Sequence, residues 1–320
     1  MAELGVIAIG RNEGERLVRC LTSLQCHDLP VVYVDSASTD GSQTRAKELG
    51  AHVLPLDMDR PFTAARARAE GFAELMRIAP DLQFVMFVDG DCEIVSSWPS
   101  AAMAFLIENT DYAAVCGRRK ERFPEASAYN ALIDQEWDTP IGEAAACGGD
   151  AVFRISAYQA VGGFDPAMIA GEEPELCARL RGADWRIMRL DEAMTVHDAA
   201  LERYGQYWNR AVRSGLGYMQ ANLATKTAPG GPLYGREIIR AVCWALLLPL
   251  ASFALAWIFH PIMLLLWPAL TGAQWLRLMA RDGVFAATLS MTGKFAELLG
   301  IARFQLRRLR GQTGGTVEYK

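Results

Sequence analysis

Roughly the first 230 residues alternate short apolar runs with longer polar stretches, and this pattern restricts the fold more than any other feature. Residues 6–9, 31–34 and 84–88 are apolar runs of the length that buried strands have. The polar stretch after the first run places Leu17 and Leu21 at helical spacing. Strands that alternate with helices form βαβ units and pair in parallel. The sequence therefore predicts an α/β domain whose mostly parallel, Rossmann-like central sheet is flanked by helices.

The chain changes in composition at residues 229–232, a Pro-Gly-Gly-Pro sequence typical of a linker. We expect one α/β domain over residues 1–229 and a membrane-associated helical region over residues 230–320. Within this second region, residues 241–259 are almost free of charge and about as long as a helix that spans a bilayer. A second apolar run follows, so that residues 238–276 are expected to form a hydrophobic hairpin.

Arginines flank the predicted hairpin on both sides: Arg236 and Arg240 before it, Arg277 and Arg281 after it. Because such residues mark cytoplasmic segments, both ends are expected at the cytoplasmic face of the cell (inner) membrane, which either a hairpin or a re-entrant pair would satisfy. Residues 294–310 predict a basic amphipathic helix suited to lie on anionic membrane lipid. Two buried core helices are the alternative, which Pro249 and Pro261 disfavour.

Charge and cysteine content argue against several classes of protein. The formal net charge of −5 disfavours a nucleic-acid partner, since such proteins usually present a basic face. The chain has 7 cysteines at scattered spacings and no CxxC pair, which fits neither a zinc knuckle nor a secreted disulfide framework. Reduced thiols in a cytosolic compartment are the simpler interpretation.

Asp89 and Asp91 follow the apolar run 84–88, at the end of a strand where ligands bind in open α/β sheets. Gly90 between them leaves room for a ligand. An isolated Asp-Gly-Asp sequence is most often a surface turn, but the strand and the motifs below favour a metal site. Hard oxygen ligands favour Mg²⁺ or Mn²⁺. His197 follows another short strand and could complete the coordination of Asp91, with a surface histidine as the alternative.

Other polar residues also follow predicted strands. Asn12 and Glu13 lie where a strand opens into a helix, and the positive helix terminus there suits a nucleotide, although Asn12 could be only a helix cap. Asp35 could accept a hydrogen bond from a nucleobase. Arg66 and Arg68 lie early in a helix, where a guanidinium could bind a diphosphate or pair with an aspartate. Ordinary surface arginines are the alternative.

Acidic and aromatic residues in the second half of the domain suggest where an acceptor would bind. Glu172 and Glu173 lie in a Gly-Glu-Glu-Pro-Glu run, which is favourable at a helix N-terminus for electrostatic reasons alone. One acid above a sugar acceptor could also deprotonate its hydroxyl group. Trp208 could stack on a sugar or anchor the chain at a membrane interface. Asp150 and Trp208 are the candidate acceptor contacts.

Taken in order, these motifs resemble the family 2 glycosyltransferases, which have the GT-A fold. The resemblance covers about residues 6–197, and the matching stretches are IAIGRNEG, VVYVDSASTDGS, FVDGDCEI, AVFRISAYQAVGGFD, GEEPELCARLR and VH. The acidic motif GEEPELC and the hydrophobic tail are similar to those of bacterial enzymes that build exopolysaccharides or lipid-linked glycans. The resemblance implies a metal-dependent, inverting transferase of the hexosyltransferase type, which takes a sugar from a nucleotide-sugar donor to a glycan or lipid-linked acceptor.

The resemblance also implies a role for each matching position on the donor side. Asp35 would contact the nucleobase, with Asn12 and Glu13 lining the same end of the site. Asp89 would face the ribose and the metal–diphosphate group. Arg68 would support the diphosphate or the aspartate pair.

The remaining matches concern the metal and the chemistry. Asp91 would bind the metal directly with His197 as a further ligand, and Glu173 would be the catalytic base with Glu172 beside it. The sequence departs from the family pattern, which often has Asp at position 173 and usually has Asn at the position of Ala69. The QxxRW signature of processive synthases is absent, so we expect transfer of a single sugar rather than polymerisation.

Two rival classes share some of these features. A sugar nucleotidyltransferase has a similar sheet but would carry a Gly-rich, basic phosphate loop, whereas this chain has Gly-Arg-Asn-Glu at residues 10–13. A membrane-tethered scaffold that binds nucleotide sugars without activity would be expected to lack Asp91 or the acid at position 173, and both are present.

Overall fold

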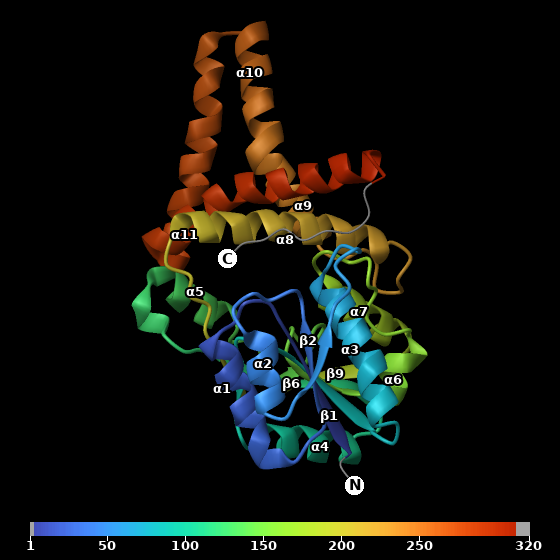
Figure 1. The fold of residues 1–320 in the computed structure, drawn as a ribbon. Coiled ribbons are helices and arrows are strands. Elements are labelled where there is room, and N and C mark those ends of the chain that lie inside the picture. The colour runs from blue at the N-terminus through green and yellow to red at the C-terminus, as the bar shows by residue number, and fades with distance from the viewer. Residues whose placement is uncertain (1–2, 312–320) are drawn as a thin grey trace. The chain divides into compact units, whose positions relative to one another are not determined.

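The computed structural model describes residues 3–311, which divide into two compact units (Figure 1). The first, here the sheet unit, comprises the residues up to Leu201 together with Thr227–Gly231. The second, here the helical unit, comprises Glu202–Lys226 and the described residues from Pro232 onward. This division differs from the expected boundary at residue 229, because helix α8 (Tyr204–Ala224) packs along α11 (Leu266–Leu309).

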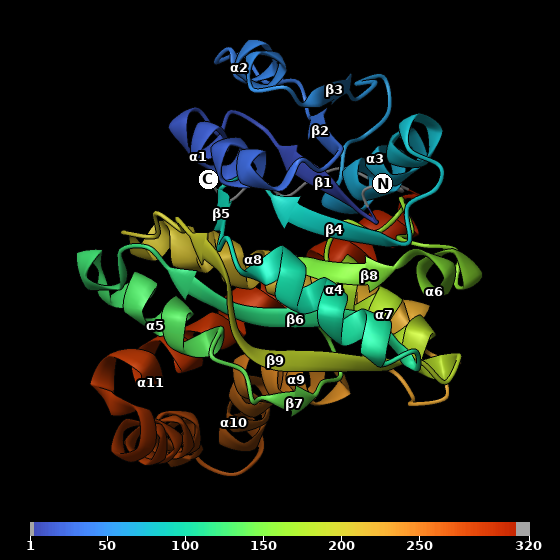
Figure 2. The same ribbon diagram turned by 90° about the horizontal axis from the view of Figure 1, so that it is seen from below.

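A nine-stranded sheet forms the centre of the sheet unit, in the order β3-β2-β1-β4-β8-β6-β9-β5 with β7 paired to β9 (Figure 2). The strands are β1 Leu4–Gly10, β2 Val31–Asp35, β3 His52–Pro55, β4 Phe84–Asp89, β5 Cys92–Ile94, β6 Tyr112–Glu121, β7 Gly142–Glu143, β8 Ala151–Arg154 and β9 Arg186–His197. The strands from β3 to β4 are parallel, and β8 runs antiparallel to both β4 and β6. The expected strands at residues 187–190 and 194–196 are thus one strand, β9.

Helices cover this sheet, and their bounds are α1 Glu15–Leu24, α2 Ser42–Glu48, α3 Ala64–Ile78, α4 Trp98–Glu108, α5 Ala128–Glu136, α6 Ile155–Ala160 and α7 Glu172–Gly182. Helix α3 packs on β1 and β2, and α4 packs on β6, β8 and β9. A Cβ atom at Gly71 of α3 would lie 2.7 Å from Ile7 and 2.6 Å from Val34, so glycine lets this helix approach the sheet closely. Close packing of this kind fixes the strand ends, where the polar residues gather.

The helical unit contains α8, α9 (Gly235–Val242), α10 (Leu248–Ile258) and α11. Helix α11 is broken at Gly283, which has a φ of 82°. Alanine at Gly215 of α8 or Gly300 of α11 would bring its Cβ to 2.0 Å from a backbone oxygen of the partner helix. These two glycines therefore permit an unusually close pairing of α8 with the second half of α11.

The expected hydrophobic hairpin is present: α10 and the first half of α11 run antiparallel beside each other (Figure 1). Gly235–Ile258 and Pro261–Leu309 are helical segments long and apolar enough to cross a membrane. Many large apolar side chains on them are exposed, including Trp257 at 92% and Ile258 at 66%. Exposure on this scale is atypical of the core helices of a soluble protein.

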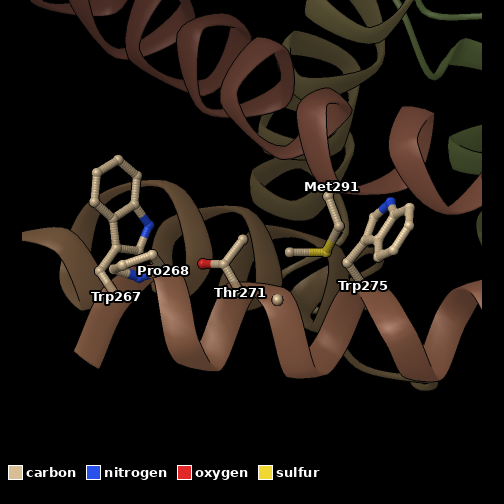
Figure 3. Close-up of a pocket in the computed structure, with 6 residues that line it drawn as sticks. Trp267, Pro268, Thr271, Trp275 and Met291 are labelled. Carbon is tan, nitrogen blue, oxygen red and sulfur yellow. The ribbon is translucent and has the colours of Figure 1, made fainter. Parts of the chain in front are cut away.

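An apolar pocket lies where the two halves of α11 face each other (Figure 3). Its lining residues are Trp267, Pro268, Thr271, Gly272, Trp275 and Met291. The indole Nε1 of Trp275 donates to Thr288 Oγ1 at 3.1 Å.

Candidate active site

The turn at residues 89–91, here the Asp-Gly-Asp turn, is held tightly at the end of β4. The backbone N–H of Asp89 donates to Asp150 Oδ1 at 3.1 Å, and that of Gly90 donates to the carbonyl oxygen of Ile9 at 2.8 Å. A Cβ at Gly90 would lie only 3.0 Å from the same carbonyl oxygen. The middle position therefore favours glycine, and the positions of both flanking aspartates are fixed by the sheet.

Two arginines, the buried Arg68 and the partly buried Arg119, surround Asp89. Arg68 of α3 donates to Asp89 Oδ1 at 2.7 Å and to Glu172 Oε1 at 2.8 Å. Arg119 of β6 lies 3.4 Å from Asp89 Oδ2 and 2.6 Å from Asp150 Oδ2. Burial disfavours the charged form of Asp89, but the two guanidinium groups outweigh burial and hold its pKa below the ordinary value. Asp89 is therefore an ionised acid whose charge is largely balanced.

Asp150 is completely buried, at 0% exposure, which corrects its expected role as an acceptor contact. It accepts hydrogen bonds from the backbone N–H of Asp89 and from Thr195 Oγ1 at 2.9 Å, and it pairs with Arg119. Asp150 thus joins β4, β6 and β9 from inside the sheet unit. It supports the site and does not present a surface to a sugar.

Asp91 and His197 lie beside each other because β5 pairs with β9, with Cys92 opposite His197. His197 Nε2 is 3.4 Å from Asp91 Oδ1, and Nδ1 is 3.6 Å from Glu121 Oε2. The edge of Trp137 packs on the imidazole with the ring centroids 4.7 Å apart. Burial alone would lower the pKa of His197, but the two carboxylates raise it to about 9.

This arrangement fits a divalent cation. A carboxylate and an imidazole nitrogen only 3.4 Å apart can reach one ion together. A second carboxylate, Glu121, stands behind the imidazole, as is usual for histidine ligands of metals. The residues that would hold Mg²⁺ or Mn²⁺ are therefore Asp91 and His197, whereas Asp89, two residues before Asp91, is held by Arg68 and Arg119.

Arg119 and Glu121 were missed by sequence reasoning. They alternate along β6 within the charged run Arg-Arg-Lys-Glu-Arg, and a strand places residues two apart on one face. That spacing places Arg119 and Glu121 on the same face of their strand, but it does not show which other residues lie against that face. The buried Glu121 also accepts from the backbone N–H of Phe123 and of Ala199, and so holds the segment that follows His197.

The two adjacent acids at the start of α7 point to different surroundings. Glu172 pairs with Arg68 and is thereby linked to Asp89. Glu173, only 7% exposed, accepts from the backbone N–H of Cys147 at 2.6 Å through Oε1. Glu172 therefore positions Arg68, whereas Glu173 faces the loop that precedes Asp150.

At the expected nucleotide end, Asn12 and Glu13 are engaged with nearby groups. Asn12 has a φ of 56°, and its Oδ1 accepts from the backbone N–H of Thr39 at 2.7 Å. The backbone N–H of Asn12 donates to Ser38 Oγ at 2.9 Å. Glu13 forms an ion pair with Arg16 at 2.7 Å. Asn12 therefore connects the loop after β1 to the loop after β2 through hydrogen bonds, and it does not cap a helix.

Asp35 is fully buried, and its oxygens are occupied. They accept from the backbone N–H of Ser38 at 2.9 Å, from Gln43 Nε2 at 2.8 Å and from Tyr33 Oη at 3.1 Å. The expected contact of Asp35 with a nucleobase is therefore not available in this conformation. It would require the side chain of Gln43 to move away.

Two further candidates have structural partners. Arg66 is buried at 2% exposure and donates to the carbonyl oxygens of Asp57 and Arg60. It also donates to Glu70. Arg66 therefore stabilises a loop and does not present its charge to a diphosphate. Trp208 belongs to the helical unit, where it packs against a small cluster. That cluster consists of Ala211, Val212 and Ala296.

Solved structures with the same fold define the class of the sheet unit. A mannosyltransferase from Pyrobaculum calidifontis, described in complex with GDP-Man and Mn²⁺, superposes with a TM-score of 0.59 over 95% of this chain and 87% of that chain, at 18% identity. TarS residues 1–349 from S. aureus superpose with a TM-score of 0.52 over 98% of this chain and 92% of that one, at 16% identity. The expected GT-A fold is confirmed.

Sequence comparison then identifies the family. The model of Glycosyl transferase family 2 matches residues 6–160, so this segment of the chain is a family 2 glycosyltransferase domain. A curated relative, the succinoglycan biosynthesis protein ExoA of Rhizobium meliloti (strain 1021), is 26% identical over 262 residues, which cover 76% of this chain and 77% of that protein.

Proposed function

We propose that this chain is an inverting glycosyltransferase of polysaccharide biosynthesis, which moves a single sugar from a nucleotide-diphosphate sugar to a hydroxyl group of a glycan or lipid-linked acceptor. The proposal rests on the two aspartates at the end of β4, each of which has its own partners. Asp91 lies beside His197, and Asp89 is tied through Arg68 to the acids that begin α7. The complex of the P. calidifontis mannosyltransferase and the name of the R. meliloti relative support the donor class and the pathway class.

Residues of the chain have distinct tasks in the proposed reaction. A Mg²⁺ or Mn²⁺ ion held by Asp91 and His197 would supply Lewis acidity towards the diphosphate leaving group. Oε1 of Glu173 is fixed by the backbone N–H of Cys147, so Oε2 is the oxygen that takes the proton of the acceptor hydroxyl. As that hydroxyl oxygen bonds to the anomeric carbon, the bond to the diphosphate oxygen breaks on the opposite side, and configuration inverts.

The nucleobase end requires a local rearrangement. Gln43 donates to Asp35 at 2.8 Å. We assign a base N–H as the donor that replaces Gln43 on this carboxylate. Asp35 would then both order the loop after β2 and recognise the nucleotide.

The proposal is tested by nucleoside diphosphate release from the full chain in detergent, with a panel of nucleotide sugars and an acceptor extract. We expect release from one donor with Mn²⁺ or Mg²⁺ and none with EDTA, because the diphosphate charge then lacks its counter-ion. The anomeric configuration of the product is read by NMR. Retention of configuration would contradict the mechanism, and donor binding with no release under any condition would favour a scaffold.

Replacement of Glu173 by Gln is expected to lower kcat by about 10²–10⁴-fold, the usual contribution of a general base. Donor affinity should change little, because the amide keeps the size of the side chain and one oxygen for the N–H of Cys147. Steady-state kinetics and calorimetry with the donor measure the two effects. Glu175→Gln is the control, since Glu175 lies on the same helix and pairs with Arg179. An unchanged kcat in Glu173→Gln would assign the base elsewhere.

We propose that the helical unit attaches the protein to the cytoplasmic face of the membrane. Leu250 and Phe253 are more than half exposed on α10, at 55% and 58%. Changing both to Asp should release much of the protein from carbonate-washed membranes, because an acid at the centre of a membrane helix costs about 2.5–3.5 kcal/mol. Phe123→Asp, at an exposed position in the sheet unit, is the control and should leave the membrane fraction unchanged. Equal retention of the Leu250/Phe253 variant would contradict the attachment.

A further inference from the structure

A cluster of two thiols and a carboxylate lies at the start of α7, distinct from Asp91 and His197. Cys147 Sγ and Cys177 Sγ are 3.6 Å apart, and they lie 3.2 Å and 2.9 Å from Glu173 Oε1. All three residues are buried, with exposures of 6% for Cys147, 0% for Cys177 and 7% for Glu173. Three potential ligand atoms therefore converge on one point.

The separations match those of a tetrahedral metal centre. With Zn–S bonds of about 2.3 Å and Zn–O bonds of about 2.0 Å, tetrahedral angles place two sulfur ligands about 3.8 Å apart and a sulfur and an oxygen about 3.5 Å apart. The two sulfurs of this cluster are already at that spacing. The carboxylate oxygen needs to move by only a few tenths of an ångström relative to either sulfur.

We propose that Cys147, Glu173 and Cys177 form a binding site for a thiophilic divalent cation of the Zn²⁺ class. Thiolate ligands select such ions over Mg²⁺ and Mn²⁺, which prefer oxygen. Three protein ligands leave a fourth position for water, as in zinc sites that are not closed. The chain thus has one site for a thiophilic ion at the start of α7 and a second site, for Mg²⁺ or Mn²⁺, at Asp91 and His197.

The local structure prepares these ligands. Glu173 and Cys177 are four residues apart on α7, so their side chains lie on the same face of the helix. Cys147 approaches from the loop before β8, and its backbone N–H fixes the carboxylate at 2.6 Å. Two separate segments therefore supply the ligands, and binding of the ion would join the loop to the helix.

One consequence rests on the proposed function. A metal ion coordinated at Oε1 of Glu173 lowers the basicity of Oε2, the oxygen that takes the proton of the acceptor hydroxyl. Occupation of the site by zinc would therefore inhibit sugar transfer at Glu173, while the ion at Asp91 and donor binding are retained. Removal of zinc by a chelator would restore activity after Mn²⁺ is added back.

The competing explanation of the cluster is a disulfide bond between the two thiols. Its formation would require an oxidant to remove two electrons and two protons, and the sulfurs would have to approach from 3.6 Å to about 2.05 Å. The present spacing is nearer to that of two ligands of one metal ion. The disulfide is therefore treated as an outcome of the test.

The test titrates Co²⁺ and Zn²⁺ into the metal-free full chain in detergent, with a phosphine reductant present. Cobalt bound by thiolates gives an intense sulfur-to-metal charge-transfer band. We expect this band in the natural chain, in the double variant Asp91→Ala/His197→Ala, and in Cys26→Ala, which removes an exposed thiol of the same unit. Cys147→Ala and Cys177→Ala should each lose the band, and each should bind one zinc ion fewer than the natural chain.

The outcomes separate the metal site from the enzymatic function. Thermal unfolding in EDTA shows whether both cysteine variants remain folded, and Glu173→Gln provides a third variant that should weaken the band without removing a thiol. Loss of the band in Cys26→Ala, or its retention in both buried variants, would overturn the site. A mass lower by two protons in the natural chain under air, with no zinc bound, would replace it by the disulfide. Zinc binding without inhibition would leave the site standing and remove Glu173 as the base.

Discussion

Replacement of Asp91 by Ala is expected to reduce the rate of sugar transfer by at least about a thousandfold, because loss of the metal removes several kcal/mol of stabilisation from the leaving group. Asp89 cannot substitute for it, since two arginines already hold that carboxylate at 2.7 Å and 3.4 Å. Asp91 instead faces the imidazole nitrogen of His197. The measurements are kcat with saturating donor and calorimetric titration of Mn²⁺, and both should show the loss.

The matched control is Asp191→Ala, which removes an exposed aspartate of β9 in the same unit. It should leave the rate and the Mn²⁺ affinity unchanged. If Asp91→Ala bound Mn²⁺ with normal affinity, the ion would be assigned to Asp89 instead. A normal rate at high Mn²⁺ would indicate that His197 and the donor diphosphate suffice to hold the ion.

The strands and the Asp-Gly-Asp turn could be predicted because their signals are local. The run at residues 84–88 is buried from Phe84 to Val88, and the chain delivers the two aspartates directly after it. Neighbouring residues along a strand stay neighbours in the fold. The same reasoning found the hydrophobic hairpin, whose length and lack of charge are properties of a continuous segment.

The surroundings of the turn could not be predicted because they depend on the strand order. Arg119 meets Asp89 and Asp150 only because β8 lies between β4 and β6. Residue type alone also suggested that Arg66 binds a diphosphate, whereas its buried guanidinium donates to carbonyl oxygens within the fold. Asp35 is likewise buried, and the local pattern did not show that Gln43 donates to it. The pairing of α8 with α11 likewise rests on two distant glycines that no local pattern connects.

These observations suggest a division of labour among the acids of the site. Asp89 and Asp150 are balanced by the arginines Arg68 and Arg119 and maintain the geometry. Asp91 lies beside a histidine and Glu173 beside two thiols, and both of these neighbours can bind metals. Acids of identical type are thus distinguished by their partners, which the sheet and α7 supply.

The Arg119–Asp150 pair provides the last test, because its predicted role concerns stability. Truncation of Arg119 to Ala leaves the buried Asp150 without its cationic partner and should cost about 3–5 kcal/mol, whereas truncation of Asp150 leaves Arg119 its longer contact with Asp89. That cost corresponds to a fall of about 10 °C or more in the unfolding midpoint of the sheet unit. The double variant Arg119→Ala/Asp150→Ala should lose clearly less than the sum of the two, since neither charge is then left alone.

Asp150→Ala also removes the acceptor for the backbone N–H of Asp89 and for Thr195 Oγ1, so it should be the more damaging single change. Arg118→Ala is the control, because Arg118 is the neighbouring arginine of β6 and pairs instead with Asp134. The thermal midpoints are compared with the KM for the acceptor in each variant. If Asp150 bound the acceptor, its replacement would raise that KM and leave the midpoint nearly unchanged. A large fall in the midpoint, coupled to Arg119, would establish that this acid holds the Asp-Gly-Asp turn from within.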